Sequence, residues 1–370
     1  MRKFTVKLIL FLSPFFLALG FELFVLPIDF FTFRALEALV VRKFRKVLPG
    51  HFYPNMNLTK EEEGDLGYHT KYAIKRTVQW ITDSYGYRKK GSDRLKYEVV
   101  IIGQSETFGS GLTQKEILSE VLEDKLNLGV YPFAPGGVNT FLKQERFILH
   151  PPEIVIVSSM EKATLLLPPP KFSSVKKWAP YETAGNIIRK MKEKRWVQSF
   201  VVFLDRVYKM NMLLYIRACI RRGFSDREEK DLNRADSKFG PILFLQGANA
   251  NKDVPEEKLN QAIQTIKGYH DLLKSKGIRF IFLVSPDKET IFYESLGTPR
   301  PVFLEQLTAR LKQLGVEIVD TQPVFEKAFQ KDSVLLYQRD DTHWNGNAVR
   351  IAADLLIKVI KGKDSILPHS

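Results

Sequence analysis

Short, continuous apolar runs that alternate with amphipathic segments constrain the fold of this chain more than any other feature. "YEVVIIG" at 97–103 and "EIVIVSS" at 153–159 are apolar on consecutive residues, as in strands covered on both faces. Segments such as 256–277 instead place apolar residues three and four apart, which is typical of helices that lie on a sheet. This order predicts a three-layer α/β/α fold with a flavodoxin-like parallel sheet. Further strands are expected near 130, 278–288 and 316–320, further helices at 113–127, 141–149 and 301–315, and a loop that runs into a last helix at 340–361.

The N-terminus begins with the basic stretch "MRKFTVK" and continues with an apolar run at 8–26 that contains one charge, Glu22. A run of this length is sufficient to cross a bilayer. The small residues Ala18 and Gly20 leave open the alternative of a cleaved signal peptide. Because the apolar character continues beyond the run, as "FELFVLPIDFFTF", we expect an uncleaved single-pass anchor in the inner (cytoplasmic) membrane. The remaining chain would then face the periplasm or the cell exterior.

The pattern divides the chain into an anchor region and one large domain. Residues 1–50 are expected to hold the anchor and a juxtamembrane helix, 30–50, which Pro49 and Gly50 would end. Residues 51–370 are expected to form the α/β domain, interrupted by a basic helical insertion at about 165–240. That insertion is interpreted either as a packed helical cap or as a helix that rests on a membrane or a partner.

The charge balance points to an anionic neighbour. The formal net charge is +14, which suits nucleic acid, anionic lipid or an acidic polysaccharide. Paired zinc ligands and aromatic RNP stretches are lacking in the sequence, so nucleic acid is not expected as a partner. The single cysteine, Cys219, excludes a disulfide within the chain and a four-cysteine zinc site.

Two loops carry residues suited to nucleophilic catalysis. Ser105 directly follows the strand at 97–103, and ligands bind beyond the carboxyl ends of strands in open α/β sheets. A serine hydroxyl needs a base, which His343 in "DDTHWN" can provide. Asp340 or Asp341, three or two residues before His343, can orient the imidazole. The alternative is that Ser105 is a turn residue or helix cap, and that Asp-Thr-His is an N-cap with a polar loop. Trp344 and Asn345 are expected to shape the loop and cap the last helix.

"GQSETFG" and "DDTHWN" resemble the outer blocks of the SGNH (GDSL-type) hydrolase and acetyltransferase superfamily. "LVSPDKETIFYE" and "LLYQRDDTHWNGNAV" are more narrowly similar to the SGNH-like domain of the alginate O-acetyltransferases of the AlgJ and AlgX type. The resemblance implies Ser105 as the nucleophile and His343 as the base. It also implies that Asp340 orients His343, with Asp341 as the rival because of the Asp-Thr-His match.

The resemblance also implies an oxyanion hole, in which backbone amides of Ser105 and of Gly136 or Gly137 would take part. The family's third block contributes an asparagine, but "IVIVSSMEKATL" has none, so Asn139 is the candidate substitute. A second departure is Gln104, where the family commonly has aspartate, and a third is the chain order, because the alginate enzymes place the Asp-His motif before the serine. No metal or cofactor is expected, because neither His-Glu-x-x-His nor a calcium loop is present.

These observations predict a membrane-anchored serine enzyme that transfers an acyl (acetyl) group to, or removes one from, an extracellular polysaccharide through a seryl ester. The expected partners are the polysaccharide or another ester-bearing envelope substrate, membrane lipid, and a membrane protein that supplies the acyl group. A simple lipid or carboxyl esterase is one alternative. A catalytically inactive glycan-binding or scaffold protein of the same fold is the other.

Overall fold

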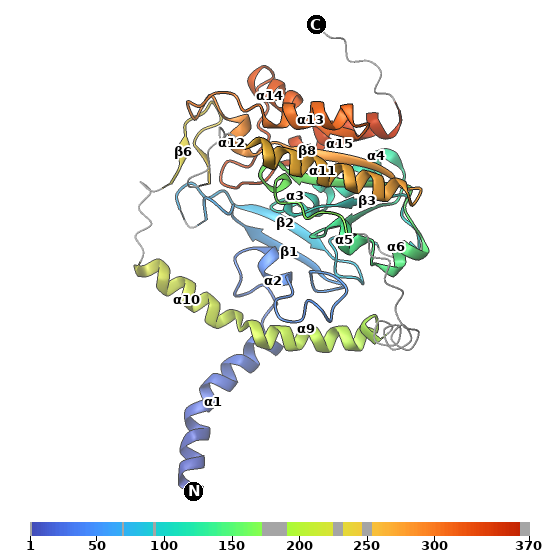
Figure 1. Cartoon of the computed structure of the whole chain (residues 1–370). Coiled ribbons are helices and arrows are strands. Elements are labelled where there is room, and N and C mark those ends of the chain that lie inside the picture. Colours follow the sequence, from blue (N-terminus) through green and yellow to red (C-terminus); the bar gives the residue numbers. More distant parts are fainter. Residues whose placement is uncertain are drawn as a thin grey trace.

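A five-stranded parallel sheet forms the centre of the computed structural model (Figure 1). Its strand order is β4-β3-β5-β8-β9, which is the 2-1-3-4-5 order of flavodoxin-like folds. The strands are β3 (Val99–Ile102), β4 (Val130–Phe133), β5 (Ile154–Met160), β8 (Arg279–Ser285) and β9 (Glu317–Asp320). The structure describes residues 2–68, 70–91, 94–171, 191–224, 232–245 and 254–362.

Helices cover both faces of this sheet, because alternate strand residues enter two separate cores. In β3, Val100 and Ile102 join one core, whereas Val99 and Ile101 join the other. The first core is closed by α11 (Glu256–Lys274) and α13 (Phe303–Gln313). The second is closed by α4 (Leu118–Leu126), α14 (Gln322–Gln330) and α15 (Gly346–Ile360). The predicted α/β/α architecture is therefore confirmed.

Short helices follow the carboxyl ends of the strands and line the edge where the site lies. They are α3 (Ser105–Phe108), α5 (Val138–Phe141), α7 (Glu161–Thr164) and α12 (Lys288–Ile291); the 3₁₀ turn Gln114–Glu116 comes after α3, and α6 (Glu145–Leu149) leads into the amino end of β5. The strand order reverses between β3 and β5, so the chain leaves these neighbouring strands in opposite directions. This switch point is the usual binding crevice of such sheets, and α3 begins there.

The N-terminal helix α1 (Arg2–Phe24) extends away from the domain (Figure 1). Within Lys3–Phe24, the most apolar 18-residue window has a mean hydropathy of 2.0 and is not buried, so its length and composition suit a membrane span. Within the described residues it is the one candidate span. The expectation of an N-terminal anchor is thus compatible with the structure.

The predicted helix at 30–50 is reduced to five residues, α2 (Ala35–Leu39). The backbone turns instead, because the Asp205 carboxylate accepts hydrogen bonds from the amides of Arg42, Lys43 and Phe44. Helix α2 packs on the antiparallel pair β1 (Asn57–Glu62) and β2 (Arg76–Ile81) in a core with Trp80. Residues 35–39 therefore pack in the same small core as β1 and β2.

The described part of the predicted insertion holds two helices, α9 (Arg195–Lys209) and α10 (Asn211–Phe224). A small strand pair follows, β6 (Arg234–Ala235) with β7 (Ile242–Leu243). The rest of the insertion, 172–190 and 225–231, lies outside the described residues. Figure 1 shows α9 and α10 extending in opposite directions from the upper end of α1.

Candidate active site

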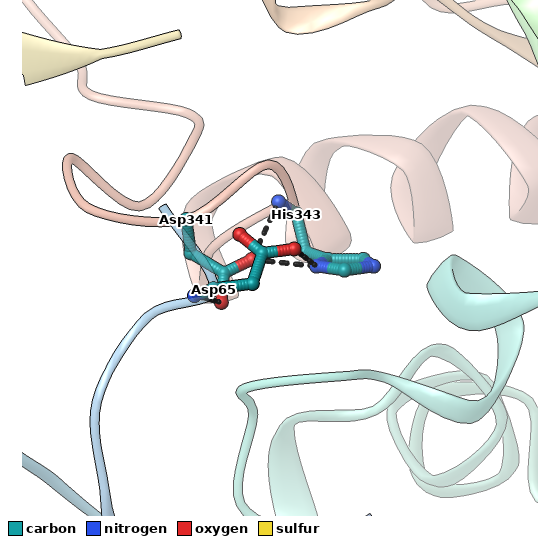
Figure 2. Close-up of side chains that lie close together, drawn as sticks. All are labelled: Asp65, Asp341 and His343. Carbon is teal, nitrogen blue, oxygen red and sulfur yellow. Dashed lines mark hydrogen bonds and ion pairs between the residues drawn. The ribbon is translucent and has the colours of Figure 1, made fainter. Parts of the chain in front are cut away.

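Asp341 and His343 form a close pair in the loop before α15. The Nδ1 atom of His343 lies 2.5 Å from Asp341 Oδ1, and the His343 backbone amide donates to the same oxygen at 2.9 Å. Asp341 is completely buried, whereas the His343 side chain is 12% exposed. Figure 2 shows the opposite edge of the imidazole ring pointing away from Asp341. The ring therefore has one nitrogen held and the other available for proton transfer.

Asp340 does not contact His343, which corrects the expectation that it is the orienting carboxylate. Its Oδ2 accepts hydrogen bonds from the amides of Gly64 and Ile74, and its Oδ1 pairs with Arg76 on β2. Residues 339–343 form turns and bends, and within them the two adjacent carboxylates take different partners. In this structure the residue beside His343 is Asp341.

The charges around the pair act on both pKa values. Burial opposes the charged form of Asp341, but the His343 hydrogen bond and charge, together with Arg34, hold its pKa well below the usual range. Burial likewise opposes a charged His343, yet Asp341, Glu106 and Asp65 raise the pKa of its imidazole. The pair therefore favours an imidazolium, the form that a base produces when it has removed a proton.

Arg34 and Asp65 complete the surroundings of Asp341 and were not predicted from the sequence. Arg34 Nη2 lies 3.3 Å from Asp341 Oδ2 and donates to Ser110 Oγ at 2.9 Å. The Asp65 backbone amide donates to Asp341 Oδ2 at 3.0 Å. Both residues lie more than 270 positions before Asp341, and neither carries a local sequence signal for this role.

One group of side chains among the described residues could hold a cation by its spacing. It consists of Asp65, Asp341 and His343, whose potential ligand atoms lie within 4.8 Å of one another (Figure 2). Their atoms are already engaged, however. The Asp65 carboxylate accepts from the amide and the hydroxyl of Thr342 at 2.9 and 2.8 Å. Asp341 is bonded by Arg34 and His343 as described above. We interpret the group as a hydrogen-bonded network that fixes the loop, and assign no metal to it.

Lys288, on α12, stabilises the loop that carries Asp341 and His343. Its Nζ donates to the carbonyl oxygens of Gln338 and Asp341 at 2.7 and 2.9 Å, and to that of Arg339 at 3.2 Å. Burial lowers the pKa of Lys288 to about 8, against the nearby charge of Asp341. The ammonium thus links α12, which follows β8, to the backbone that carries Asp341 and His343.

Ser105 begins α3 directly after β3, at the switch point of the sheet. Gly103 permits this tight turn, because a Cβ atom there would lie 2.0 Å from Thr107 Oγ1. The half-buried Ser105 hydroxyl donates to Glu106 Oε1 at 3.2 Å. No hydrogen bond joins it to His343 in the part of the chain that is described, although the buried Glu106 carboxylate interacts electrostatically with His343. Catalytic hydrogen bonds often tighten only when substrate is bound.

The predicted oxyanion donors other than Ser105 are engaged elsewhere. The Gly136 amide donates to the Gly103 carbonyl at 2.9 Å, and the Gly137 amide donates to Thr140 Oγ1 at 3.1 Å. Asn139 Nδ2 donates to the Pro169 carbonyl at 2.9 Å, so its side chain fixes a loop. Within the described residues, the backbone amides of Ser105 and Glu106 have no acceptor. These two amides, at the start of α3, are the donors that remain.

Comparison with known proteins adds sequence similarity to this geometry. Residues 243–369 match the SGNH hydrolase-like domain of the acetyltransferase AlgX. The match contains Asp341 and His343 but does not reach Ser105. The resemblance to SGNH acetyltransferases that the sequence predicted is confirmed for this part of the chain.

The sequence similarity to individual relatives extends over a limited part of the chain. The chain is 28% identical over 110 residues to a Pseudomonas putida protein named "Probable alginate O-acetylase AlgJ", and the match covers 28% of each chain. A Pseudomonas syringae pv. tomato protein of the same name is 28% identical over 103 residues, with 26% of each chain covered. The chain thus spans roughly a quarter of these relatives. A solved structure of the lipolytic G-D-S-L family from Veillonella parvula aligns with 11% identity, covering 71% of this chain and 98% of that one, at a TM-score of 0.36.

Proposed function

We propose that this protein is a membrane-anchored SGNH-type serine enzyme that moves an acyl group, most simply acetyl, onto or off an extracellular polysaccharide. Ser105 would be the nucleophile, His343 the general base and Asp341 the residue that orients it. The observation that carries the proposal is the 2.5 Å contact between Asp341 and His343 within a segment similar to AlgX. The position of Ser105 at the switch point of the same sheet supports it.

In the first half-reaction, Ser105 Oγ attacks the acyl carbonyl of an ester-type donor while His343 removes the hydroxyl proton. The tetrahedral oxyanion would face the amides of Ser105 and Glu106. Collapse of this intermediate breaks the bond to the donor alcohol, which takes the proton from His343 and leaves. The acyl group is then bonded to Ser105 as an ester.

In the second half-reaction, a sugar hydroxyl attacks the seryl ester and His343 takes its proton. Collapse releases the acetylated sugar and returns the proton to Ser105 Oγ. With water in place of the sugar, the same steps remove acyl groups. Transfer therefore requires that the bound sugar keep water away from the seryl ester. We infer that a membrane partner supplies the acyl donor. α1 would keep the enzyme beside that partner, with the domain on the periplasmic or outer side.

A non-catalytic glycan-binding or scaffold role is the second candidate. The engagement of Gly136, Gly137 and Asn139 in local hydrogen bonds favours it, because fewer donors are left for an oxyanion. Loss of one oxyanion donor costs about 10²–10³ in rate in serine enzymes. This role predicts a folded protein with an unreactive Ser105.

The deciding experiment is labelling of the full-length protein in detergent with a fluorophosphonate, together with hydrolysis of p-nitrophenyl acetate. We expect Ser105→Ala to abolish labelling and Ser105→Ala and His343→Ala each to lower kcat by about 10³-fold or more, because triad members act as a unit. Asp340→Asn and Asp341→Asn, compared side by side, test the assignment: the Asp341 variant should lose far more activity.

Ser275→Ala is the matched control, since the Ser275 hydroxyl only donates to the Leu272 carbonyl at the end of α11. It should label and turn over like the parent protein. If the folded parent protein neither labels nor hydrolyses the ester, the enzymatic proposal fails and the binding role takes its place.

A further inference from the structure

Helix α9 contacts the protein through a side that mixes polar residues with Val201, which joins a small core with Val41, and it turns large apolar side chains away from the protein. Gln198, Asp205 and Lys209 are buried beneath the helix, where Asp205 and Lys209 bond to the backbone of residues 37–44. On the opposite side, Trp196 and Phe200 follow at a spacing of four residues and are 64% and 56% exposed. A helix whose function was to cap the domain would bury this apolar stripe instead.

Helix α10 continues the exposed apolar surface. Its inward contact is made by Tyr215, whose ring stacks on Phe33 and packs on Phe31. Four large apolar side chains of α10 are exposed: Leu213, Leu214, Ile216 and Ile220. With Trp196, Phe200 and Tyr208 of α9 they form the surface that we call the helical arm. Exposed apolar patches of this extent mark an interaction site.

The arm is joined to the end of the candidate membrane span. The ring of Phe203 on α9 lies 5.9 Å from that of Phe24, the last residue of α1. Arg206 donates to the Glu22 carbonyl at 3.1 Å, and the Met212 amide donates to the Glu22 carboxylate at 3.2 Å. Figure 1 shows both arm helices running crosswise to α1 at its domain end. A membrane crossed by α1 would therefore have its surface at the level of the arm.

Exposed cations border the apolar residues of the arm. Lys194 and Arg195 precede Trp196, and Arg217 lies among the apolar residues of α10. The ammonium of Lys43 lies over the exposed Tyr208 ring at 5.3 Å. Basic residues beside tryptophan, tyrosine and leucine are the composition of helices that lie in the interface of anionic membranes.

We propose that α9 and α10 lie in the headgroup region of the bilayer that α1 spans, with Trp196, Phe200 and the exposed leucines and isoleucines at the acyl boundary. The occupant of this surface is thus anionic lipid, and not a protein partner. The proposal rests on the anchoring by α1 within the proposed function, and is independent of the chemistry of Ser105. The arm would set the height and tilt of the domain above the membrane. It also contacts the segment that reaches the site, because Tyr215 stacks on Phe33 and the next residue, Arg34, pairs with Asp341.

The test uses the full-length protein in vesicles of phosphatidylglycerol and phosphatidylcholine. In a Cys219→Ser background, bimane is attached to Phe200→Cys and, as the matched control, to Leu314→Cys, an exposed apolar position at the end of α13. Lipid that carries a nitroxide near the headgroup should quench position 200 roughly two-fold or more, because such helices insert about 5–10 Å. Position 314 should stay unquenched. A label on the native, exposed Cys219 repeats the measurement without a substitution in the arm.

Carbonate washing of the same vesicles separates the two parts of the proposal. Retained protein with quenching at position 200 and Cys219, but not at 314, supports the arm. Retained protein with equal quenching at 200 and 314 overturns it while leaving the anchor intact. Release from the vesicles overturns the anchor and the arm together. If position 200 is unquenched in vesicles but blocked from a water-soluble maleimide in native membranes, a protein covers the surface and lipid is the wrong occupant. Fluorophosphonate labelling of the same sample reports on Ser105 independently.

Discussion

Helices α9 and α11 are both amphipathic, but α11 buries its large apolar side chains whereas α9 leaves Trp196 and Phe200 exposed. α11 buries its apolar stripe, including Ile263 and Ile266, against the central sheet and exposes glutamate and lysine. α9 buries Gln198, Asp205 and Lys209 and exposes Trp196 and Phe200. The two helices therefore have different roles: α11 excludes water from a large core, whereas α9 is fixed to the domain by buried hydrogen bonds and by the small contact of Val201.

This difference shows what hydrophobic periodicity can predict. A spacing of three and four residues identifies a helix with an apolar side. It does not identify what covers that side, which can be a sheet, a lipid surface or another protein. For α11 the strands around it supply the answer, since β8 lies directly beneath. For α9, the contact with α1 supports the proposal that a lipid surface covers it.

Core packing provides the largest expected contrast. Ile266→Ala, at a fully buried position of α11, should lower the free energy of unfolding by about 2–4 kcal/mol through lost burial and a cavity. Phe200→Ala on α9 should change it by about 0.5 kcal/mol or less, because the side chain is exposed. Urea denaturation of both variants in detergent measures the two values. A cost for Phe200→Ala equal to that for Ile266→Ala would show that the stripe of α9 packs on protein, and the comparison would fail.

The polar side of α9 provides the second contrast. Asp205→Ala should cost about 1–3 kcal/mol, since the amides of residues 42–44 and the Tyr53 hydroxyl lose their buried acceptor. Hydrogen exchange should show faster exchange in α9 and in residues 42–44, with α11 unchanged. Ser199→Ala, at an exposed position of the same helix, is the control and should leave exchange as in the parent. Uniform loss of protection across the domain would mean that α9 is part of the main cooperative core.

The smallest expected effect is a shift in the pH dependence of kcat/KM. The comparison is between a buried carboxylate at the site, Glu106, and one beneath α9, Asp205. His343 acts as a base only when neutral, and its raised pKa places the acid limb of kcat/KM above the ordinary histidine value of about 6.5. Glu106→Gln removes a negative charge that favours the imidazolium, so the pKa of His343 falls and the acid limb moves to lower pH. Asp205→Asn should leave the limb in place. An unchanged or higher limb in Glu106→Gln would contradict the assignment of His343 as the base.

Most of the sheet could be predicted from the sequence, because its strands are covered on both faces and read as continuous apolar runs. The first core strand, β3, lies within the run at 97–103, and β9 within 316–320. The prediction that Asn345 caps the last helix is also confirmed, since its Oδ1 accepts from the amides of Asn347 and Ala348. The helix expected at 30–50 was wrong beyond α2, because the amides of residues 42–44 donate to Asp205 of α9, which lies more than 160 positions away.

The candidate site was predictable only where its residues are neighbours in the chain. The His343 loop was identified, but the choice between Asp340 and Asp341 depended on Arg76, Gly64 and Ile74, which withdraw Asp340 from the ring. Arg34, Asp65 and Lys288 could not be found from local patterns. Gly136, Gly137 and Asn139 were plausible by position, but their donors are engaged in hydrogen bonds that only the folded loop defines.

The amino-acid sequence by itself determined the parallel α/β/α core, the apolar N-terminal helix, the position of Ser105 after a strand and that of His343 in the loop before the last helix. These features depend on local periodicity, length and turn chemistry, which a single chain segment contains. The tertiary structure decided which aspartate pairs with His343, which amides near Ser105 remain without an acceptor, and which side of α9 faces outward. Those outcomes depend on hydrogen bonds and contacts between distant segments, and their geometry exists only once the chain has folded.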